Sequence, residues 1–387
     1  MGIFEKLEKD LTKLENENQH DGYWYSTTDA LLVLVCGMLC GLSNIDDIHD
    51  WAKSNPSKKF FEKEFKMKKL FCRAQFYNLL GCVDPEAFKH IFIGWMSYVL
   101  GSGLEGKTVS IDGKTICSTD SLTKDGSVLH IASALVSEFN LVIGNQECAT
   151  KTDEINAFRE LVGMLDVSGS VVVADALHCK PKSAKAVIDA EADYLFVVKD
   201  NQEELKEDIE LYFQTEESES YQTQEKNGGR IETRTGYVSH DINWLDQKEK
   251  WIDLECIGAI HREFEKNGIK SSEWHYYISS CPLSAKELLK RARMEWAVES
   301  MHWLLDVHFD EDRTRVFDMN VQKILNTTRK ISLNMVRIFR DNFRTKRTPL
   351  TSVFKENLFD HEQLVAFLDF FRNFESLQHI RESVLEN

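Results

Sequence analysis

Two short, uninterrupted apolar runs constrain the fold of this chain more than any other feature. They are SVVVA at residues 170–174 and YLFVV at residues 194–198. A continuous apolar run of this length is typical of a strand that is buried on both faces of a sheet. Residues 181–190, between the two runs, predict a helix. The order strand, helix, strand favours a parallel crossover and therefore an α/β fold.

Three further extended segments precede these runs, at residues 108–112, 129–137 and 140–147. The stretch SEFN between the last two suits a hairpin turn. A helix is expected over 153–165, because Phe158, Leu161, Val162 and Leu165 recur at helical spacing. The sequence therefore predicts a mixed sheet that starts as an antiparallel meander and continues with parallel crossovers.

The remainder of the chain predicts helices and one more group of strands. Residues 1–100 favour helices throughout, which fit either a plain helical bundle or a module that binds DNA ends. Strands are expected over 230–280 as an inserted antiparallel sheet, after an acidic, turn-rich stretch. Further helices are expected over 201–213, 284–307, 319–343 and 361–382. We predict domains at 1–105, 106–345 and 346–387, with the β-rich insertion at about 214–283.

Composition bears on the location of the protein and on its partners. The first residues do not resemble a signal peptide, and the most apolar run, 30–42, is shorter than the ~20 residues that span a bilayer. Nine cysteines without a CxxC pair favour free thiols in the cytoplasm and argue against a zinc site. The net charge of −16 argues against a nucleic-acid partner, but residues 203–225 are strongly acidic and residues 323–347 are basic.

Two acids follow predicted strands directly. Asp112 lies in TVSIDGKTIC and is expected at the end of the strand 108–112, and Asp175 follows SVVVA. On the predicted helix 284–307, Glu299 shares one face with Glu295, His302 and Asp306. This polar stripe faces either solvent or a metal. Taken singly, each acid also fits a cap, a turn or a solvated helix face.

Together, these acids have a defined chemistry. Strand ends and a helix can bring Asp112, Asp175 and Glu299 to one place, where a buried carboxylate needs a cation. Two hard cations ~3.5–4 Å apart, held by oxygen ligands, can activate a water or a 3′-hydroxyl and stabilise the leaving oxygen. The predicted activity is phosphoryl transfer on nucleic acid.

Several long segments resemble the bacterial insertion-sequence DDE transposases of the H-repeat-associated type. IDGKT is similar to the first-Asp motif of that family. The run from KTDEINAFRELV through SVVVADALHC to FVVKDNQ resembles its central block, and RIETR and YYISS resemble later markers. WAVESMHWLLDVHFDED followed by LNTTRKISLNMVR looks like the third-acid helix and the C-terminal block. The resemblance covers most of the chain.

This resemblance implies an RNase H-like mixed sheet flanked by helices, with an inserted β-rich subdomain and an N-terminal helical domain. It implies that Asp112, Asp175 and Glu299 are catalytic and hold two Mg²⁺ ions, for which Mn²⁺ can substitute. The family's activity is metal-dependent cleavage of DNA at element ends and joining of the 3′ ends to target DNA. The implied partners are the terminal inverted repeats, target DNA and a second copy of the chain. No membrane partner is implied.

The sequence departs from the family pattern at several positions. Glu295 stands where many members have histidine, Ser300 where many have asparagine, and Cys117 where an arginine often follows. None of these departures removes an acid of the triad.

We expect basic side chains from three regions to contact DNA phosphates: Lys199, Arg230 and Arg234, with Arg329 and Lys330 from the basic stretch. Arg230 and Arg234 lie an even number of residues apart on a predicted strand and so point to the same side. Two alternatives stay open: a DNA-binding regulator that does not cut, and a metal-dependent nuclease that cuts without joining ends.

Overall fold

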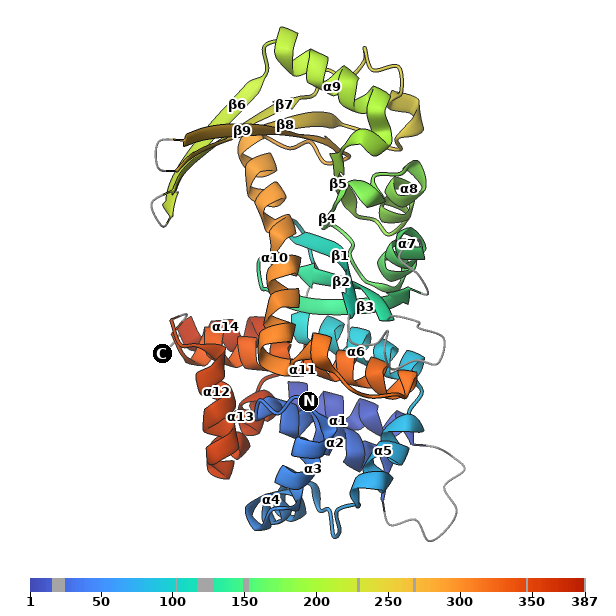
Figure 1. Cartoon of the computed structure of the whole chain (residues 1–387), viewed down its shortest axis with the longest axis vertical. Coiled ribbons are helices and arrows are strands. Elements are labelled where there is room, and N and C mark those ends of the chain that lie inside the picture. Colours follow the sequence, from blue (N-terminus) through green and yellow to red (C-terminus); the bar gives the residue numbers. More distant parts are fainter. Residues whose placement is uncertain are drawn as a thin grey trace.

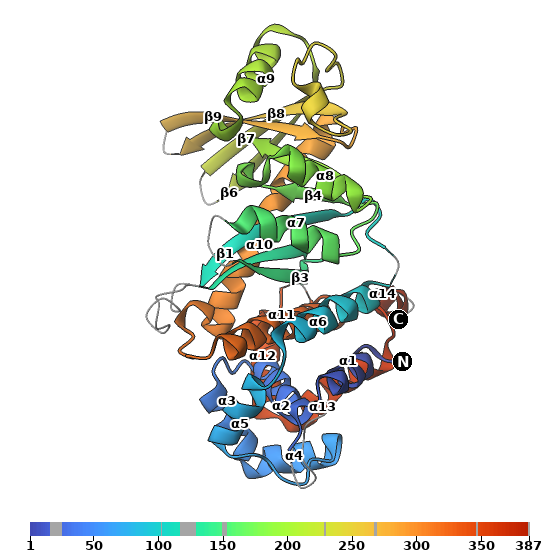
Figure 2. The same ribbon diagram turned by 90° about the vertical axis from the view of Figure 1, so that its right-hand side faces the viewer.

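The computed structural model describes residues 1–15, 25–101, 103–116, 129–148, 153–227, 230–266, 269–345 and 347–385. The molecule is elongated (Figure 1). Helices from both ends of the chain form one end, a sheet with helices on both faces forms the middle, and a group of long strands forms the other end (Figure 2). Among the described helices, none combines the length and the hydrophobicity that a membrane-spanning segment requires.

One mixed sheet has the strand order β3-β2-β1-β4-β5-β9-β8-β7-β6. β1, β4 and β5 are parallel, and the other neighbours are antiparallel. This arrangement confirms the predicted mixed α/β sheet with its antiparallel start and two parallel crossovers. The strands are β1 Thr108–Ile116, β2 Leu129–Val136, β3 Leu141–Cys148, β4 Val171–Ala174, β5 Asp193–Val198, β6 Glu219–Asn227, β7 Arg230–Ser239, β8 Cys256–Lys266 and β9 Ile269–Ser279.

The crossover helices cover one face of the sheet and a single long helix covers the other. α7 (Glu154–Met164) and α8 (Pro181–Asp189) lie on the first face, and α9 (Glu203–Thr215) packs on β8 and β9. α10 (Ala285–Phe309) crosses the opposite face, from β6 and β7 past β1 (Figure 1). Its first turns lie so close to β8 that a Cβ on Gly258 would be 2.6 Å from Leu288 Cδ2. The glycine therefore sets how closely α10 approaches the sheet.

The strand segments differ from the prediction in three ways. β1 does not end at Asp112, because pairing with β2 continues as far as Ile116. The acidic stretch, predicted as turns, contains β6, whose polar side chains suit an edge strand. The inserted strands are not a separate sheet, because β9 pairs with β5 and so extends the central sheet.

The helical end is built from both ends of the chain. Its helices are α1 Ile3–Leu11, α2 Thr27–Leu39, α3 Ile45–Lys53, α4 Asn55–Phe65, α5 Arg73–Gly81, α6 Pro85–Leu100, α11 Met319–Phe343, α12 Leu350–Phe359, α13 His361–Asn373 and α14 Leu377–Leu385. α12 was not predicted, and the predicted helix 361–382 is divided between α13 and α14. The domain boundaries at 105 and 345 stay a prediction.

Helix α11 is the centre of this helical end and also closes one edge of the sheet. It packs against α2, α5 and α6, and most of its side chains are buried. The Asn334 amide accepts a hydrogen bond from Val142 N–H at 2.9 Å and donates one to Val142 C=O at 2.7 Å. These bonds satisfy backbone groups on the edge strand β3, which would otherwise be buried without partners.

Candidate active site

The parallel register of β1 and β4 places Asp112 and Asp175 side by side. The last registered pair of these strands is Ile111 with Ala174, and each acid is the next residue along its chain. Asp175 accepts a hydrogen bond from Leu177 N–H at 3.0 Å, so it also caps the short turn after β4. The Asp175 carboxylate can therefore cap this turn and also belong to the candidate active site.

Alternate residues of β1 face helix α10, because side chains alternate along a strand. Ser110 Oγ donates to the carbonyl of Met294 at 3.0 Å. Lys114 Nζ lies 2.6 Å from Asp306 Oδ1, further along the same helix. Asp112 lies between these two contacts, and its Oδ2 is 3.7 Å from His302 Nδ1. The strand therefore holds α10 on both sides of Asp112.

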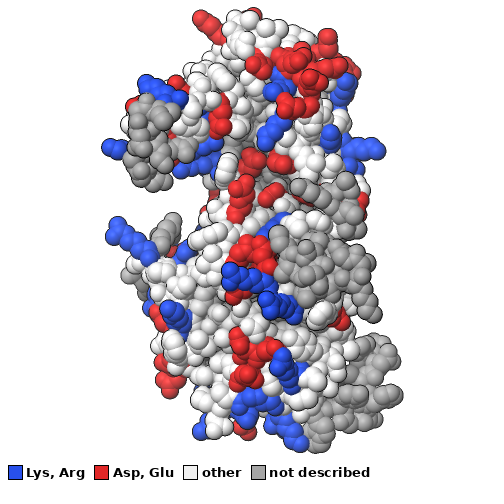
Figure 3. Space-filling model, viewed as in Figure 1, with Lys and Arg blue, Asp and Glu red and all other residues white. Residues whose placement is uncertain are grey.

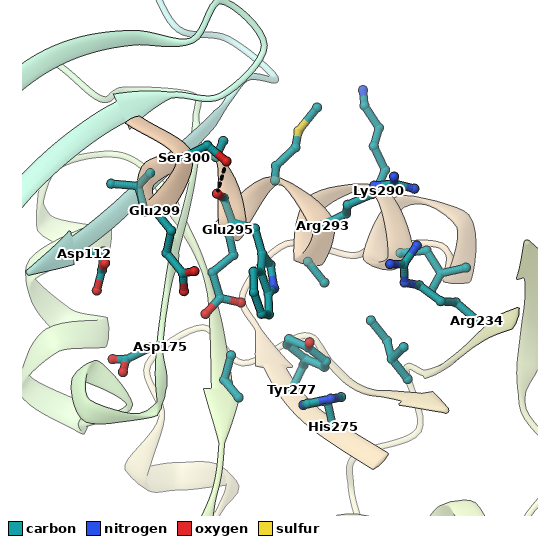
Figure 4. A pocket seen from close by; sticks show the side chains of 18 of the residues that line it. Asp112, Asp175, Arg234, His275, Tyr277, Lys290, Arg293, Glu295, Glu299 and Ser300 are labelled. Atoms are coloured by element: carbon teal, nitrogen blue, oxygen red, sulfur yellow. Dashed lines mark hydrogen bonds between the residues drawn. The ribbon is translucent and has the colours of Figure 1, made fainter. Parts of the chain in front are cut away.

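Glu299 joins the two aspartates at one cavity of about 890 Å³. It lies on the stretch of α10 between Met294 and His302, and its side chain is exposed. Figure 4 shows the carboxylates of Asp112, Asp175 and Glu299 at one end of this cavity, with Glu295 beside them. Three acids far apart in the sequence thus reach one place, together with a fourth from the predicted stripe.

The electrostatics of this end of the cavity are dominated by negative charge. Burial, together with the carboxylates of Asp175, Glu154 and Glu299, raises the pKa of Asp112 to about 6. Burial and the neighbouring acids likewise raise the pKa of Glu295 to about 7, although Lys199 opposes the shift. His302 provides no positive charge, because burial lowers its pKa to about 3. The acids therefore repel one another here, and Lys199 offsets this repulsion only in part.

These donors fit a divalent metal ion. Carboxylate oxygens are the ligands that hard cations prefer, and acids that repel one another in a partly buried site favour a bound cation. Within the described ranges, no group of three or more His, Cys, Asp or Glu side chains lies close enough together to hold a metal ion by itself.

The opposite end of the same cavity is basic. Arg234, Arg262, Lys290 and Arg293 line it, from β7, β8 and α10, whereas Lys199, at the end of β5, acts on Glu295. The arginines are held by acids of the neighbouring strands: Arg234 and Arg262 both contact Glu232, at 2.5 and 2.9 Å. In Figure 3 the molecule is hollowed below the projecting strands, which carry Lys and Arg side chains. This distribution explains how a chain with a charge of −16 can offer a basic surface.

Two of the residues expected to contact DNA are buried, and this part of the prediction is wrong. Arg329 is 2% exposed and Lys330 is 1% exposed. Arg329 donates to Thr314 Oγ1 at 2.7 Å, and Lys330 donates to Asn326 Oδ1. They lie on the enclosed helix α11 and compensate the buried acid Glu311. Lys199 and Arg234 line the cavity, whereas the side chain of Arg230 lies outside the described part of the structure.

Comparison with known proteins decides the family. Residues 106–335, more than half of the chain, match the family described as "Transposase DDE domain", and residues 9–96 match the family that accompanies it, "DDE_Tnp_1-associated". The chain belongs to the DDE transposase family. It is therefore a DNA transposase, a polynucleotidyl transferase that depends on divalent metal and binds DNA.

Individual relatives agree with this assignment. The chain is 31% identical to "Putative transposase YncI" of Escherichia coli O157:H7, over 82% of this chain and 83% of the relative. It is 29% identical to "H repeat-associated putative transposase YhhI" of Escherichia coli K12, over 83% and 88% of the two chains. A distant solved structure is the piggyBac transposase synaptic complex with hairpin DNA, at 11% identity and a TM-score of 0.45, over 99% of this chain and 82% of that one.

Sequence reasoning missed the basic residues that α10 and β8 bring to the DDE transposase cavity. Lys290 and Arg293 precede Glu299 on α10, and Arg262 comes from β8. The helical spacing of Lys290, Arg293 and Ala297 could have suggested one face, but the packing of α10 against β7 was needed to place that face at the cavity.

Proposed function

We propose that Asp112, Asp175 and Glu299 are the catalytic triad of this DDE transposase, and that they hold two Mg²⁺ ions, for which Mn²⁺ can substitute. The observation that carries the proposal is the meeting of these three carboxylates, from β1, the end of β4 and α10, at one cavity. When bound, the ions would activate a water or a 3′-hydroxyl and stabilise negative charge at the scissile phosphate.

The chain's own residues then have distinct tasks. Asp112 and Asp175 are fixed by the strands, whereas Glu299 depends on how α10 sits against β1. His302 lies beside the Asp112 carboxylate and, being neutral, adds no charge to the site. Lys199, which acts on Glu295, and Arg234, at the other end of the cavity, would bind phosphates that flank the one being cleaved. A DNA strand bound along the cavity would thus contact basic side chains with its flanking phosphates and the acids with its scissile phosphate.

The proposed reaction is cleavage at the element's terminal inverted repeats, followed by joining of the 3′ ends to target DNA. Two ends must be processed and joined together, so we propose that a homodimer supplies two such sites. We also propose a cytoplasmic location, since the eight described cysteines are all free thiols, as in a reducing compartment.

The direct test is the variant Asp112→Asn, compared with Asp189→Asn, which makes the same change at an exposed acid on α8. Asp112→Asn should keep the fold and DNA binding but lose metal-dependent nicking, whereas Asp189→Asn should keep all three. Nicking that survives in Asp112→Asn would refute the assigned role. Cleavage without any joined product would instead support a nuclease.

A further inference from the structure

We propose that Glu154, at the start of α7, is a fourth carboxylate of the metal site, and that the buried His178 positions it. This proposal rests on the proposed function, because it extends the same metal site. Glu154 approaches Asp112 from the face of the sheet opposite α10, where β1 extends beyond the end of β4.

The first observation is that the space beside Gly113 is filled by the Glu154 carboxylate. A Cβ added to Gly113 would lie 2.3 Å from Glu154 Oε1 and 2.4 Å from its Cδ. No larger residue fits there without moving the carboxylate. Since Gly113 follows Asp112 directly, the glycine brings an acid from another element next to the first acid of the triad.

The second observation concerns charge. Glu154 is only 12% exposed at its side chain, and no Lys or Arg in the described part of the chain forms an ion pair with it. Glu154 is therefore a largely buried carboxylate whose charge no lysine or arginine of the described chain compensates.

The third observation is a buried histidine without a hydrogen-bond partner. His178 is 1% exposed, and neither of its ring nitrogens has a hydrogen-bond partner among the described residues. Its ring stacks on Phe158, one turn along α7 from Glu154, with centroids 4.5 Å apart. This stacking aims Nε2 between two carboxylates, at 3.5 Å from Glu154 Oε1 and 3.9 Å from Asp175 Oδ1.

Such a histidine is what an acidic metal site uses to orient its ligands. Carboxylates that bind metal are in turn held by outer hydrogen-bond donors, whose loss ordinarily weakens metal binding. A buried imidazole costs free energy unless its nitrogens find partners. His178 can donate to Glu154 or to Asp175, and so is placed to fix these two acids relative to each other. The DNA-bound enzyme would hold its divalent ions with acids from both faces of β1.

The test is Mn²⁺ binding to the purified full-length chain, measured by electron paramagnetic resonance and by titration calorimetry. Glu154→Gln keeps the size of the side chain and removes its charge. We expect it to weaken Mn²⁺ binding by at least about tenfold. The matched control is Glu160→Gln on the same helix, where the exposed carboxylate accepts a hydrogen bond from Gln146. The control should bind Mn²⁺ as the wild type does.

Thermal unfolding separates a metal role from a structural one. Without metal, Glu154→Gln should melt at the same temperature as the wild type or higher, because it relieves repulsion with Asp112. With saturating Mn²⁺, its gain in melting temperature should be smaller than that of the wild type. Glu154→Asp, which keeps the charge on a shorter side chain, should recover part of the binding and gives a second measurement if Glu154→Gln does not fold.

Two results would overturn the inference: wild-type Mn²⁺ affinity in Glu154→Gln, or an equal loss of melting temperature with and without metal. Failure of the proposed function looks different. In that case the wild type itself binds no Mn²⁺ and does not nick DNA, and Asp112→Asn behaves like the wild type.

Discussion

Lys114 Nζ lies 2.6 Å from Asp306 Oδ1, and this ion pair joins β1, which carries Asp112, to α10, which carries Glu299. Lys114 is two residues beyond Asp112 and on the same side of the strand, while Asp306 is seven residues beyond Glu299 and on the same face of the helix. Lys114 also pairs with the buried Glu311 at 3.1 Å. The position of Glu299 relative to Asp112 therefore depends on this ion-pair cluster.

Loss of the Lys114 ammonium should destabilise the protein strongly. Burial by itself would lower the pKa of Lys114, but Glu311, Asp306 and Asp312 outweigh it and raise the pKa. Lys114→Met leaves Glu311, which is 1% exposed, with one cation fewer, and should lower the free energy of unfolding by about 3–5 kcal/mol. Urea denaturation followed by circular dichroism measures this change.

The matched substitution is Lys185→Met, which removes an exposed ion pair with Asp189 on α8. Its cost should be below about 1 kcal/mol. Equal costs for the two substitutions would show that the Lys114 cluster does not hold α10 in place.

The metal-free protein should lose stability as the pH rises through the titration of Asp112 and Glu295. Their pKa values in the folded chain, about 6 and about 7, lie above the ordinary values of 3.8 and 4.5. The folded state therefore binds these protons more tightly than the unfolded state does. Their stabilising contribution is complete below pH about 4 and is lost as the pH rises through about 6 for Asp112 and about 7 for Glu295. It should be measured as the free energy of unfolding against pH, in EDTA.

Asp112→Asn isolates the first of these groups. It should become more stable than the wild type as the pH rises from about 4 to 6, by roughly 1–3 kcal/mol at pH 7 without metal. Added Mg²⁺ should reverse the order, because only the wild type keeps all the acids of the site. A constant difference between the two proteins across this pH range would contradict the environment assigned to Asp112.

Salt dependence should separate the basic residues at the cavity from those in the core. Lys199→Gln and Lys290→Gln each remove an exposed ammonium at the cavity. Each should weaken DNA binding and make the plot of log affinity against log salt less steep, by about 0.9 for each DNA phosphate that the variant no longer neutralises. Fluorescence anisotropy with labelled DNA, over a series of salt concentrations, measures both effects.

Arg329→Gln provides the contrast, because it removes a buried cation instead. It should lower the free energy of unfolding. The DNA affinity of the molecules that remain folded should depend on salt as it does in the wild type. A shallower salt dependence in Arg329→Gln, with Lys199→Gln unchanged, would place the DNA elsewhere on the molecule.

Local patterns predicted the central sheet well. The runs at 170–174 and 194–198 are buried strands because β4 and β5 lie inside the sheet, and the polar stripe on α10 marks the helix that carries Glu299. The end of β1 could not be predicted, because only pairing with β2 shows that the strand continues beyond Asp112.

Long-range packing accounts for the residues that were misplaced or missed. Charge alone suggested that Arg329 and Lys330 face solvent, but α11 is enclosed by helices from both ends of the chain, and Glu311 compensates their charge. In the sequence, β2 and β3 lie between Gly113 and Glu154, so only the fold brings these two residues together. The sole local signal was the small residue directly after Asp112.

The measurement that tests the central claim most directly is a cleavage assay on the DNA that flanks the protein's own gene, with Mg²⁺ or EDTA. The wild type and Glu160→Gln should nick this DNA at matched repeats in Mg²⁺ and join the freed 3′ ends to target DNA. Glu299→Gln should bind the same DNA without nicking it. Nicking that persists in Glu299→Gln, or binding without nicking by the wild type in both Mg²⁺ and Mn²⁺, would contradict the assignment of Asp112, Asp175 and Glu299 as the catalytic site.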